Sequence, residues 1–188
     1  MMAYSARFDD AVALAVHDFR DVVRKETRIP YITHLFAVCA TVGEYGGDED
    51  QLIAAILHDW LEDVDGSTAE ALTDRFGPRV SRLVVSLSDT VLRPKPPWRE
   101  RKERYLAHLA NEPPEVKLIS AADKLHNCSS IRRDLRMFGP SVFDRFTGRR
   151  DGTLWYYEHV ASALGVGWAH PLLDELKEAV GGLVRDAL

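Results

Sequence analysis

Apolar residues recur every three to four positions along most of the chain, a period typical of amphipathic α-helices. Several helix-start signals agree with this period. Asp48 is a good N-cap, and Ser67 with Glu70 forms a capping box. Pro78 suits a first helical turn. No useful length of chain alternates polar and apolar residues as a strand does, so the pattern predicts an all-α fold. The helices that we expect cover residues 6–25, 31–45, 49–63, 68–77, 79–88, 98–110, 114–135, 152–164 and 171–188.

The chain has 188 residues, a length that fits one domain with a substantial core. Residues 89–97 form a proline-rich, basic loop between two helical blocks, but this loop is too short to divide them into separate domains. We therefore expect a single domain over residues 1–188, with a C-terminal helix at residues 171–188.

Composition narrows the class of protein. The net charge of −5 argues against a general nucleic-acid binder. No apolar run approaches the roughly 20 residues of a membrane span, and the N-terminal residues lack the apolar core of a signal peptide. Cys39 and Cys128 sit in apolar helical patterns and are expected to be buried thiols. We expect a soluble cytoplasmic protein that binds neither nucleic acid nor membrane, and the sequence leaves its oligomeric state open.

Four polar residues interrupt otherwise apolar helical runs: His34, His58, Asp59 and Asp123. A buried charge costs several kcal/mol unless it is paired or bound to a metal. Two imidazoles and two carboxylates suffice for one divalent metal and leave positions for water and substrate. Taken alone, His34 could equally be a core histidine bonded to a backbone carbonyl. Asp123 could instead form a buried ion pair with an arginine.

Glu62 and Asp63 lie one helical turn after His58 and Asp59, so they stack a second acidic layer over the first. The alternative is a helix end with solvated acids. Asn127 lies one turn after Asp123 and shares its face.

Basic residues gather at two places that could meet phosphate. Arg24 and Lys25 end the first expected helix, where a guanidinium could stack on a purine and an ammonium could meet phosphate. They could instead complement the dipole of a helix C-terminus. In the second cluster Lys95 is favoured for a substrate role because prolines bracket it, whereas the others could form a solvated helix face. The members of this second cluster are Arg93, Lys95, Arg99, Arg101, Lys102 and Arg104.

Ordered motifs connect these residues to a known family. The motifs are Arg24-Lys25, Pro30-Tyr31-Ile32-Thr33-His34, His58-Asp59-x-x-Glu62-Asp63, Phe76-Gly77-x-x-Val80, Pro94-Lys95 with Arg101-Lys102, and Ala122-Asp123-Lys124-Leu125-His126-Asn127. Over about residues 7–165 the chain resembles the HD-domain metal-dependent phosphohydrolases. Within them it is most similar to the hydrolase domain of Rel/Spo-type alarmone enzymes, which includes small alarmone hydrolases.

The resemblance implies an all-helical HD domain that removes pyrophosphate from the 3′ position of ppGpp or pppGpp. It implies one Mn2+, or another divalent metal such as Fe2+, held by His34, His58, Asp59 and Asp123. Mixed histidine and aspartate ligands without thiolate also suit these metals better than structural Zn2+. Further roles follow from the resemblance alone: Glu62 and Asp63 for the attacking water, Arg24 for the guanine, Lys25 for phosphate, Asn127 for the ribose, and Tyr156 for the nucleotide pocket.

Some positions differ from the family pattern. Leu35 stands where proline is usual, Trp60 replaces a small or β-branched residue, and His126 replaces a common tyrosine. These differences leave the nucleotide open between a guanosine alarmone, an adenosine alarmone and an ordinary nucleotide. Two alternatives remain: another HD nucleotide phosphohydrolase acting on mono- or triphosphates, and a non-catalytic nucleotide-binding HD module. Such a module would be expected to have lost a metal ligand, and none of the four is lost.

Overall fold

The computed structural model describes residues 4–90 and 94–188. Within these ranges it contains α-helices, one short 3-10 helix and no β-strand, and its β-structure is limited to one isolated bridge. The predicted all-α fold is confirmed. Arg93 of the basic cluster lies outside the described residues. No described helix combines the length and the apolarity that a membrane span needs.

The chain divides into two compact units, residues 1–91 and 92–188. The single domain over residues 1–188 stays a prediction.

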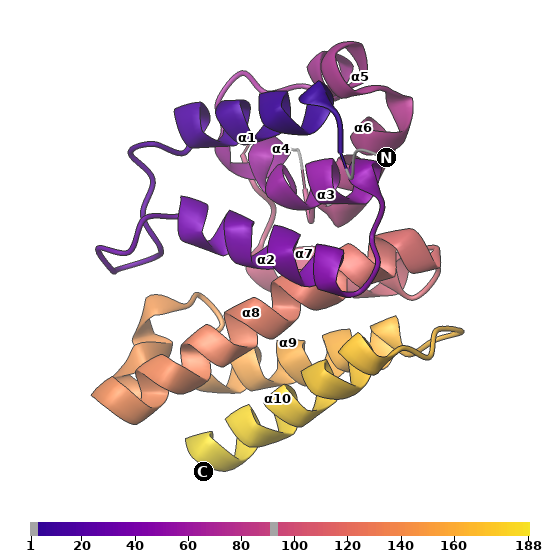
Figure 1. Ribbon diagram of the computed structural model, residues 1–188. Coiled ribbons are helices and arrows are strands. Elements are labelled where there is room, and N and C mark those ends of the chain that lie inside the picture. The colour runs from indigo at the N-terminus through magenta and orange to yellow at the C-terminus, as the bar shows by residue number, and fades with distance from the viewer. Residues whose placement is uncertain (1–3, 91–93) are drawn as a thin grey trace. The chain divides into compact units, whose positions relative to one another are not determined.

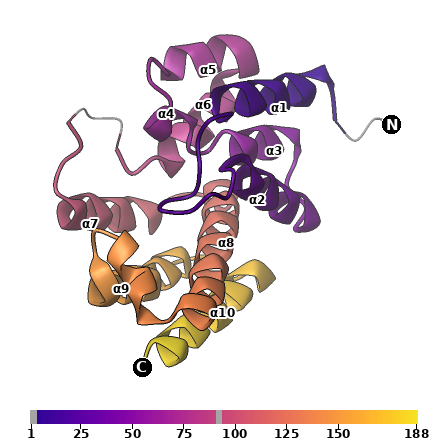
Figure 2. The ribbon, with the colours of Figure 1, turned by 90° about the vertical axis from the view of Figure 1, so that its left-hand side faces the viewer.

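The first unit contains α1 (Ala6–Asp18), α2 (Ile32–Glu44), α3 (Glu49–Ile56), α4 (Trp60–Asp63), α5 (Ala69–Phe76) and α6 (Pro78–Leu87). In both views α3 lies between α1 and α2 (Figures 1 and 2). Ile53, Ala54, Ala55 and Ile56 are all fully buried, so α3 is enclosed on every side. The sequence from Leu52 to Leu57 is apolar all round a helix, which predicts a central position, and this burial confirms that prediction for α3 within its unit.

Local capping sets most helix starts in this unit. Asp48 and Gln51 form a reciprocal capping box at the start of α3, and Pro78 occupies the first turn of α6, as predicted. At α5 the N-cap is Thr68, whose side chain accepts from the Ala71 N–H at 3.1 Å. The predicted Ser67 cap is therefore wrong by one residue.

The expected helix over residues 6–25 is too long, because α1 ends at Asp18. The chain then forms a narrow loop in which Val23 and Pro30 make an antiparallel bridge. Two backbone hydrogen bonds close the loop, from Arg24 N–H to the Ile29 carbonyl at 2.8 Å and from Tyr31 N–H to the Val22 carbonyl at 2.9 Å. The apolar stripe continues past Asp18 without a glycine or proline, so the helical period gave no sign of this end.

The second unit contains α7 (Trp98–Leu109), α8 (Pro114–Phe138), the 3-10 helix η1 (Pro140–Arg145), α9 (Arg149–Leu164) and α10 (Pro171–Ala187). The long helix α8 packs against α9 and α10 (Figures 1 and 2). α9 begins three residues before the predicted Gly152. Gly148 and Gly152 both lie against the ring of Trp98, and the lack of a side chain at these two positions allows α9 to lie close to α7. Cys39 and Cys128 are both buried free thiols, as expected.

Candidate metal centre

His34 enters the site from α2 and is fully buried. It lies one turn after Tyr31, and its backbone N–H donates to the Tyr31 carbonyl at 2.8 Å. The loop that closes on Tyr31 therefore also fixes the start of the helix that carries His34.

His58 and Asp59 lie in a break between α3 and α4, whereas we predicted one continuous helix over residues 49–63. Leu57 has φ −110° and ψ 9°, and Asp59 has φ −96° and ψ 1°, which are values of the bridge region rather than of an α-helix. Side chains of adjacent residues in a regular helix diverge by roughly 100°. The break removes that constraint and allows both side chains to face one point.

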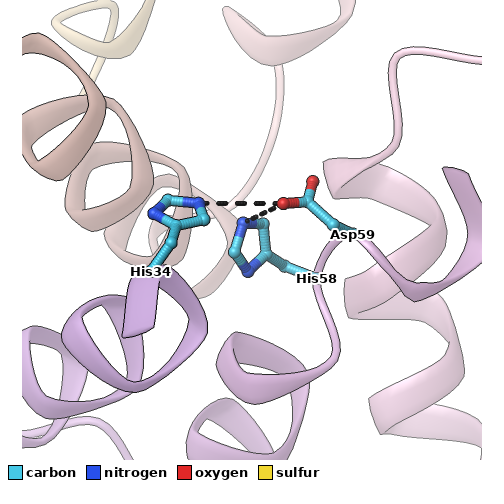
Figure 3. A group of neighbouring side chains, drawn as sticks. All are labelled: His34, His58 and Asp59. Atoms are coloured by element: carbon cyan, nitrogen blue, oxygen red, sulfur yellow. Dashed lines mark ion pairs between the residues drawn. The ribbon is translucent and has the colours of Figure 1, made fainter. Parts of the chain in front are cut away.

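The three side chains meet at that point. One possible ligand atom from each of His34, His58 and Asp59 lies within 4.8 Å of the others. Asp59 Oδ2 is 3.0 Å from His58 Nε2 and 3.7 Å from His34 Nε2, and Figure 3 shows both rings directed at this oxygen. The two histidine side chains are almost completely buried, and the Asp59 side chain is 20% exposed. Two imidazoles and a carboxylate, open to solvent on the Asp59 side, form a donor set that suits a divalent metal with free positions.

The tautomer of His58 is consistent with this use. His58 Nδ1 lies 2.8 Å from the Ala55 carbonyl oxygen, which can only accept, so Nδ1 carries the proton. In the neutral ring Nε2 then presents its lone pair toward Asp59 and His34. A second nitrogen fixed by a backbone carbonyl is typical of histidines that bind metals.

Tyr31 is the contact that sequence reasoning missed at this site. Its hydroxyl donates to Asp59 Oδ2 at 2.6 Å. Tyr31 precedes His34 by three residues, the spacing of neighbours on one helix face, and this spacing was the available signal.

Glu62 and Asp63 belong to α4 and lie outside the group of three ligand atoms. Glu62 is half-buried, and its Oε1 accepts from the backbone N–H of Asp89 at 2.8 Å. Asp63 is exposed. The Glu62 carboxylate thus ties α4 to the residues after α6. The roles of Glu62 and Asp63 toward water stay predictions.

Asp123 belongs to the second unit, on α8, and is buried. Its carboxylate pairs with the Lys124 ammonium and accepts from the Asn127 side-chain amide. The pKa of Lys124 is raised well above its ordinary value, because burial alone would lower it but the Asp123 charge and the nearby tyrosines outweigh burial. The alternative of a buried ion pair is therefore present, with a lysine in place of the expected arginine. The metal role of Asp123 and the ribose role of Asn127 stay predictions.

Arg24 does not end a helix, because α1 stops at Asp18. The alternative that Arg24 and Lys25 complement a helix C-terminus is therefore wrong. The Arg24 guanidinium carbon instead lies 5.5 Å from the centroid of the Tyr31 ring, while Lys25 is exposed. This contact links Arg24 to the residue that binds Asp59.

The remaining predicted substrate residues belong to the second unit. Tyr156 is buried, its hydroxyl has no hydrogen-bond partner in the described part of the chain, and Lys102 Nζ lies 4.8 Å from its ring centroid. Lys95 is exposed. Arg99 and Arg104 form i,i+4 ion pairs with Glu103 and Glu100, at 2.7 and 2.6 Å, which favours a solvated helix face for these two arginines.

Comparison with known proteins identifies the family to which the chain belongs. The profile of the HD domain matches residues 11–154, so the chain belongs to the HD-domain family. A solved structure described as a metazoan ortholog of SpoT that hydrolyses ppGpp superimposes with a TM-score of 0.79 at 30% identity, covering 98% of both chains. The structure of lmo0812 from Listeria monocytogenes aligns with a TM-score of 0.72 at 28% identity, covering 78% of this chain and 96% of that one.

The names of similar proteins indicate which members of the family the chain resembles. The chain is 34% identical over 140 residues to the guanosine-3′,5′-bis(diphosphate) 3′-pyrophosphohydrolase MESH1 of Drosophila melanogaster, which covers 73% of this chain and 74% of that protein. It is 40% identical over 105 residues to a probable GTP pyrophosphokinase of Mycobacterium leprae, covering 55% of this chain. The chain spans 13% of the length of the M. leprae protein and 57% of that of MESH1 from Danio rerio.

Proposed function

We propose that this HD-domain chain is a metal-dependent nucleotide phosphohydrolase that removes the 3′-pyrophosphate of ppGpp and releases GDP and pyrophosphate. The observation that carries the proposal is the convergence of His34, His58 and Asp59 on one point. The choice of substrate is supported by relatives named as 3′-pyrophosphohydrolases and by the fold shared with a ppGpp hydrolase.

The proposed cofactor is one Mn2+, held by His34, His58 and Asp59, with Asp123 as the fourth ligand. Nitrogen and carboxylate ligands without thiolate support Mn2+, and they also suit Fe2+. When bound, such a metal lowers the pKa of a coordinated water and polarises a phosphoryl oxygen.

The chain's own groups then supply proton transfer and orientation. Glu62 and Asp63 orient the attacking water and take its proton. The water oxygen forms a bond to the phosphorus on the 3′ oxygen while the bond from that phosphorus to the 3′ oxygen breaks. The 3′ oxygen takes up the proton that the carboxylates removed from water and leaves as the 3′ hydroxyl of GDP, and the released group is pyrophosphate. Basic side chains offset the charge that grows on the phosphoryl oxygens.

Five further residues are proposed to bind the nucleotide. Arg24 stacks on the purine, and Lys25 and Lys95 meet phosphate. Asn127 contacts the ribose and Tyr156 lines the pocket. Both lysines are exposed, which supports a role in binding an anionic ligand.

The deciding experiment is a nucleotide panel with metal-loaded protein. It compares ppGpp and its adenosine counterpart with GDP, GTP, ATP and nucleoside monophosphates, and it follows pyrophosphate and phosphate release. We expect pyrophosphate from the 3′-pyrophosphorylated nucleotides and little turnover of the others. Turnover of ordinary mono- or triphosphates alone would assign a different HD phosphohydrolase. Binding of ppGpp without turnover by metal-loaded protein would assign a non-catalytic module.

A further inference from the structure

The hydroxyl of Tyr31 contacts the carboxylate oxygen on which the two imidazoles converge. The distance from this hydroxyl to Asp59 Oδ2 is 2.6 Å, and the same oxygen lies 3.0 Å from His58 Nε2. An ionised carboxylate can only accept, so the phenol is the donor. Hydrogen bonds from a hydroxyl to an ionised oxygen are short and about twice as strong as neutral ones.

The Tyr31 ring is itself held in place by its surroundings. It stacks on the buried ring of Phe19, with centroids 5.5 Å apart and an interplanar angle of 14°. Its centroid is also 5.5 Å from that of His34, in an edge-on arrangement. The Tyr31 backbone N–H donates to the Val22 carbonyl at 2.9 Å. Ring and backbone are thus both fixed, so the hydroxyl has a defined position.

Asp59 is the most exposed of the three side chains that meet at the centre. His34 is held within a helix, and His58 is oriented by the Ala55 carbonyl at 2.8 Å. Asp59 lies in the break between α3 and α4, as His58 does, but its side chain is 20% exposed whereas the two histidine side chains are almost completely buried. A partly exposed carboxylate outside regular structure samples several rotamers unless a neighbour selects one.

We propose that Tyr31 is a positioning residue whose hydroxyl holds the Asp59 carboxylate in the orientation that faces both imidazoles. The proposal rests on the proposed function only in that it needs the metal centre, and it needs no particular nucleotide. Partners of metal ligands typically contribute about 10- to 100-fold to metal affinity or activity.

The ring of Tyr31 has a second contact that can be separated from the first. The Arg24 guanidinium lies over this ring at 5.5 Å from the centroid. Tyr31→Phe removes the hydroxyl and keeps the ring under Arg24. Tyr31→Leu removes both. If the hydroxyl acts on the metal centre, Tyr31→Phe lowers kcat and leaves the nucleotide KM nearly unchanged, whereas Tyr31→Leu also raises KM.

The primary test measures metal binding without nucleotide. Mn2+ affinity is determined from the electron paramagnetic resonance signal of free Mn2+, and ligand geometry from the visible spectrum of the Co2+-loaded protein. We expect Tyr31→Phe to weaken Mn2+ binding by about 10- to 100-fold and to change the Co2+ spectrum. The matched control is Tyr45→Phe, because Tyr45 flanks the other end of the same helix.

Wild-type Mn2+ affinity and an unchanged Co2+ spectrum in Tyr31→Phe would overturn the proposal. So would an equal effect of Tyr45→Phe, since the loss would then reflect the helix rather than the hydroxyl. Failure of the proposed function is distinguishable. In that case the wild type binds Mn2+ but hydrolyses nothing in the nucleotide panel, and the Mn2+ titration of Tyr31→Phe still decides the role of the hydroxyl.

Discussion

At the residue scale, each side chain of the metal centre is oriented by a different kind of contact. A helix carries His34, a backbone carbonyl orients the His58 ring, and a phenol hydroxyl contacts the Asp59 carboxylate. The Glu62 carboxylate accepts a hydrogen bond from the backbone N–H of Asp89, which lies just after α6. Because each side chain depends on a different contact, a single substitution can change the orientation of one side chain and leave the contacts of the others in place.

Asp59→Ala and Asp123→Ala should each abolish metal retention and hydrolysis, because each would remove one of the two anionic ligands in the proposed metal centre. Metal content after gel filtration, measured by atomic emission, checks this together with pyrophosphate release. Asp144→Ala is the matched control, since Asp144 is 71% exposed and forms a surface ion pair with Arg149. Full activity of chelated, metal-free wild type would contradict the prediction.

Glu62→Gln should keep the metal and the fold yet reduce kcat by about 10²- to 10⁴-fold, the usual contribution of a general acid–base group. The fold should persist because the glutamine carbonyl oxygen can still accept from the Asp89 N–H. Circular dichroism, metal content and turnover together check this. Asp65→Asn, at an exposed position after α4, is the matched control. Loss of the metal in Glu62→Gln would make Glu62 a ligand and its assigned role wrong.

Arg24→Ala should weaken binding of a purine nucleotide by about 0.5–2 kcal/mol, the range of cationic stacking on an aromatic ring. Hydrolysis of a small activated phosphodiester should remain almost unchanged, because that substrate has no purine. Steady-state kinetics on both substrates checks this, with the exposed Arg28→Ala in the same loop as control. Equal losses on both substrates would show that Arg24 acts by supporting Tyr31.

At the element scale, two interruptions of helical structure position the side chains of the metal centre. The chain leaves α1 at Asp18 and forms the loop that ends at Tyr31, and it breaks between α3 and α4 at His58 and Asp59. In the second unit, Gly148 at the start of α9 and Gly181 within α10 differ in what a side chain would meet. A Cβ at Gly148, at the start of α9, would lie 2.8 Å from the Trp98 ring, whereas at Gly181 the nearest atom is a flexible Arg185 nitrogen at 3.4 Å.

Gly148→Ala should therefore lower the free energy of unfolding by about 1–3 kcal/mol, because the rigid indole cannot yield without moving α7 or α9. Gly181→Ala should raise it by about 0.5–1 kcal/mol, because alanine has lower conformational entropy in the unfolded chain and a higher helix propensity. Urea unfolding of the two variants and the wild type measures both. Equal changes in the two variants would show that Trp98 does not constrain Gly148.

At the scale of the whole molecule, a metal that binds only folded protein stabilises the chain by mass action. Mn2+ at 100 times its dissociation constant should add about 2.7 kcal/mol, which for a chain of this length raises the Tm by about 5–10 °C. Calorimetry in excess Mn2+ and in chelator measures the difference. Asp59→Ala should melt at the same temperature in both conditions. A Tm of the wild type that is unaffected by Mn2+ would contradict a resident metal centre.

The sequence by itself determined what depends on near neighbours along the chain. Apolar periodicity predicted nearly every helix, and the cap at Asp48 and the proline at Pro78 marked starts that the structure confirms. Burial of α3 followed from its apolar residues on all sides. These features were predictable because helix formation and capping depend on residues within about one turn of each other.

Only the tertiary structure decided how the site is assembled. The end of α1 at Asp18, the break at residues 57–59 and the hydrogen bond from Tyr31 to Asp59 left no mark in the helical period. Tyr31 and Asp59 are 28 positions apart, and the Glu62 carboxylate meets an N–H 27 positions away. Packing of α2 and α4 against their neighbours sets such distances, because burial and long-range hydrogen bonds override local helix propensity.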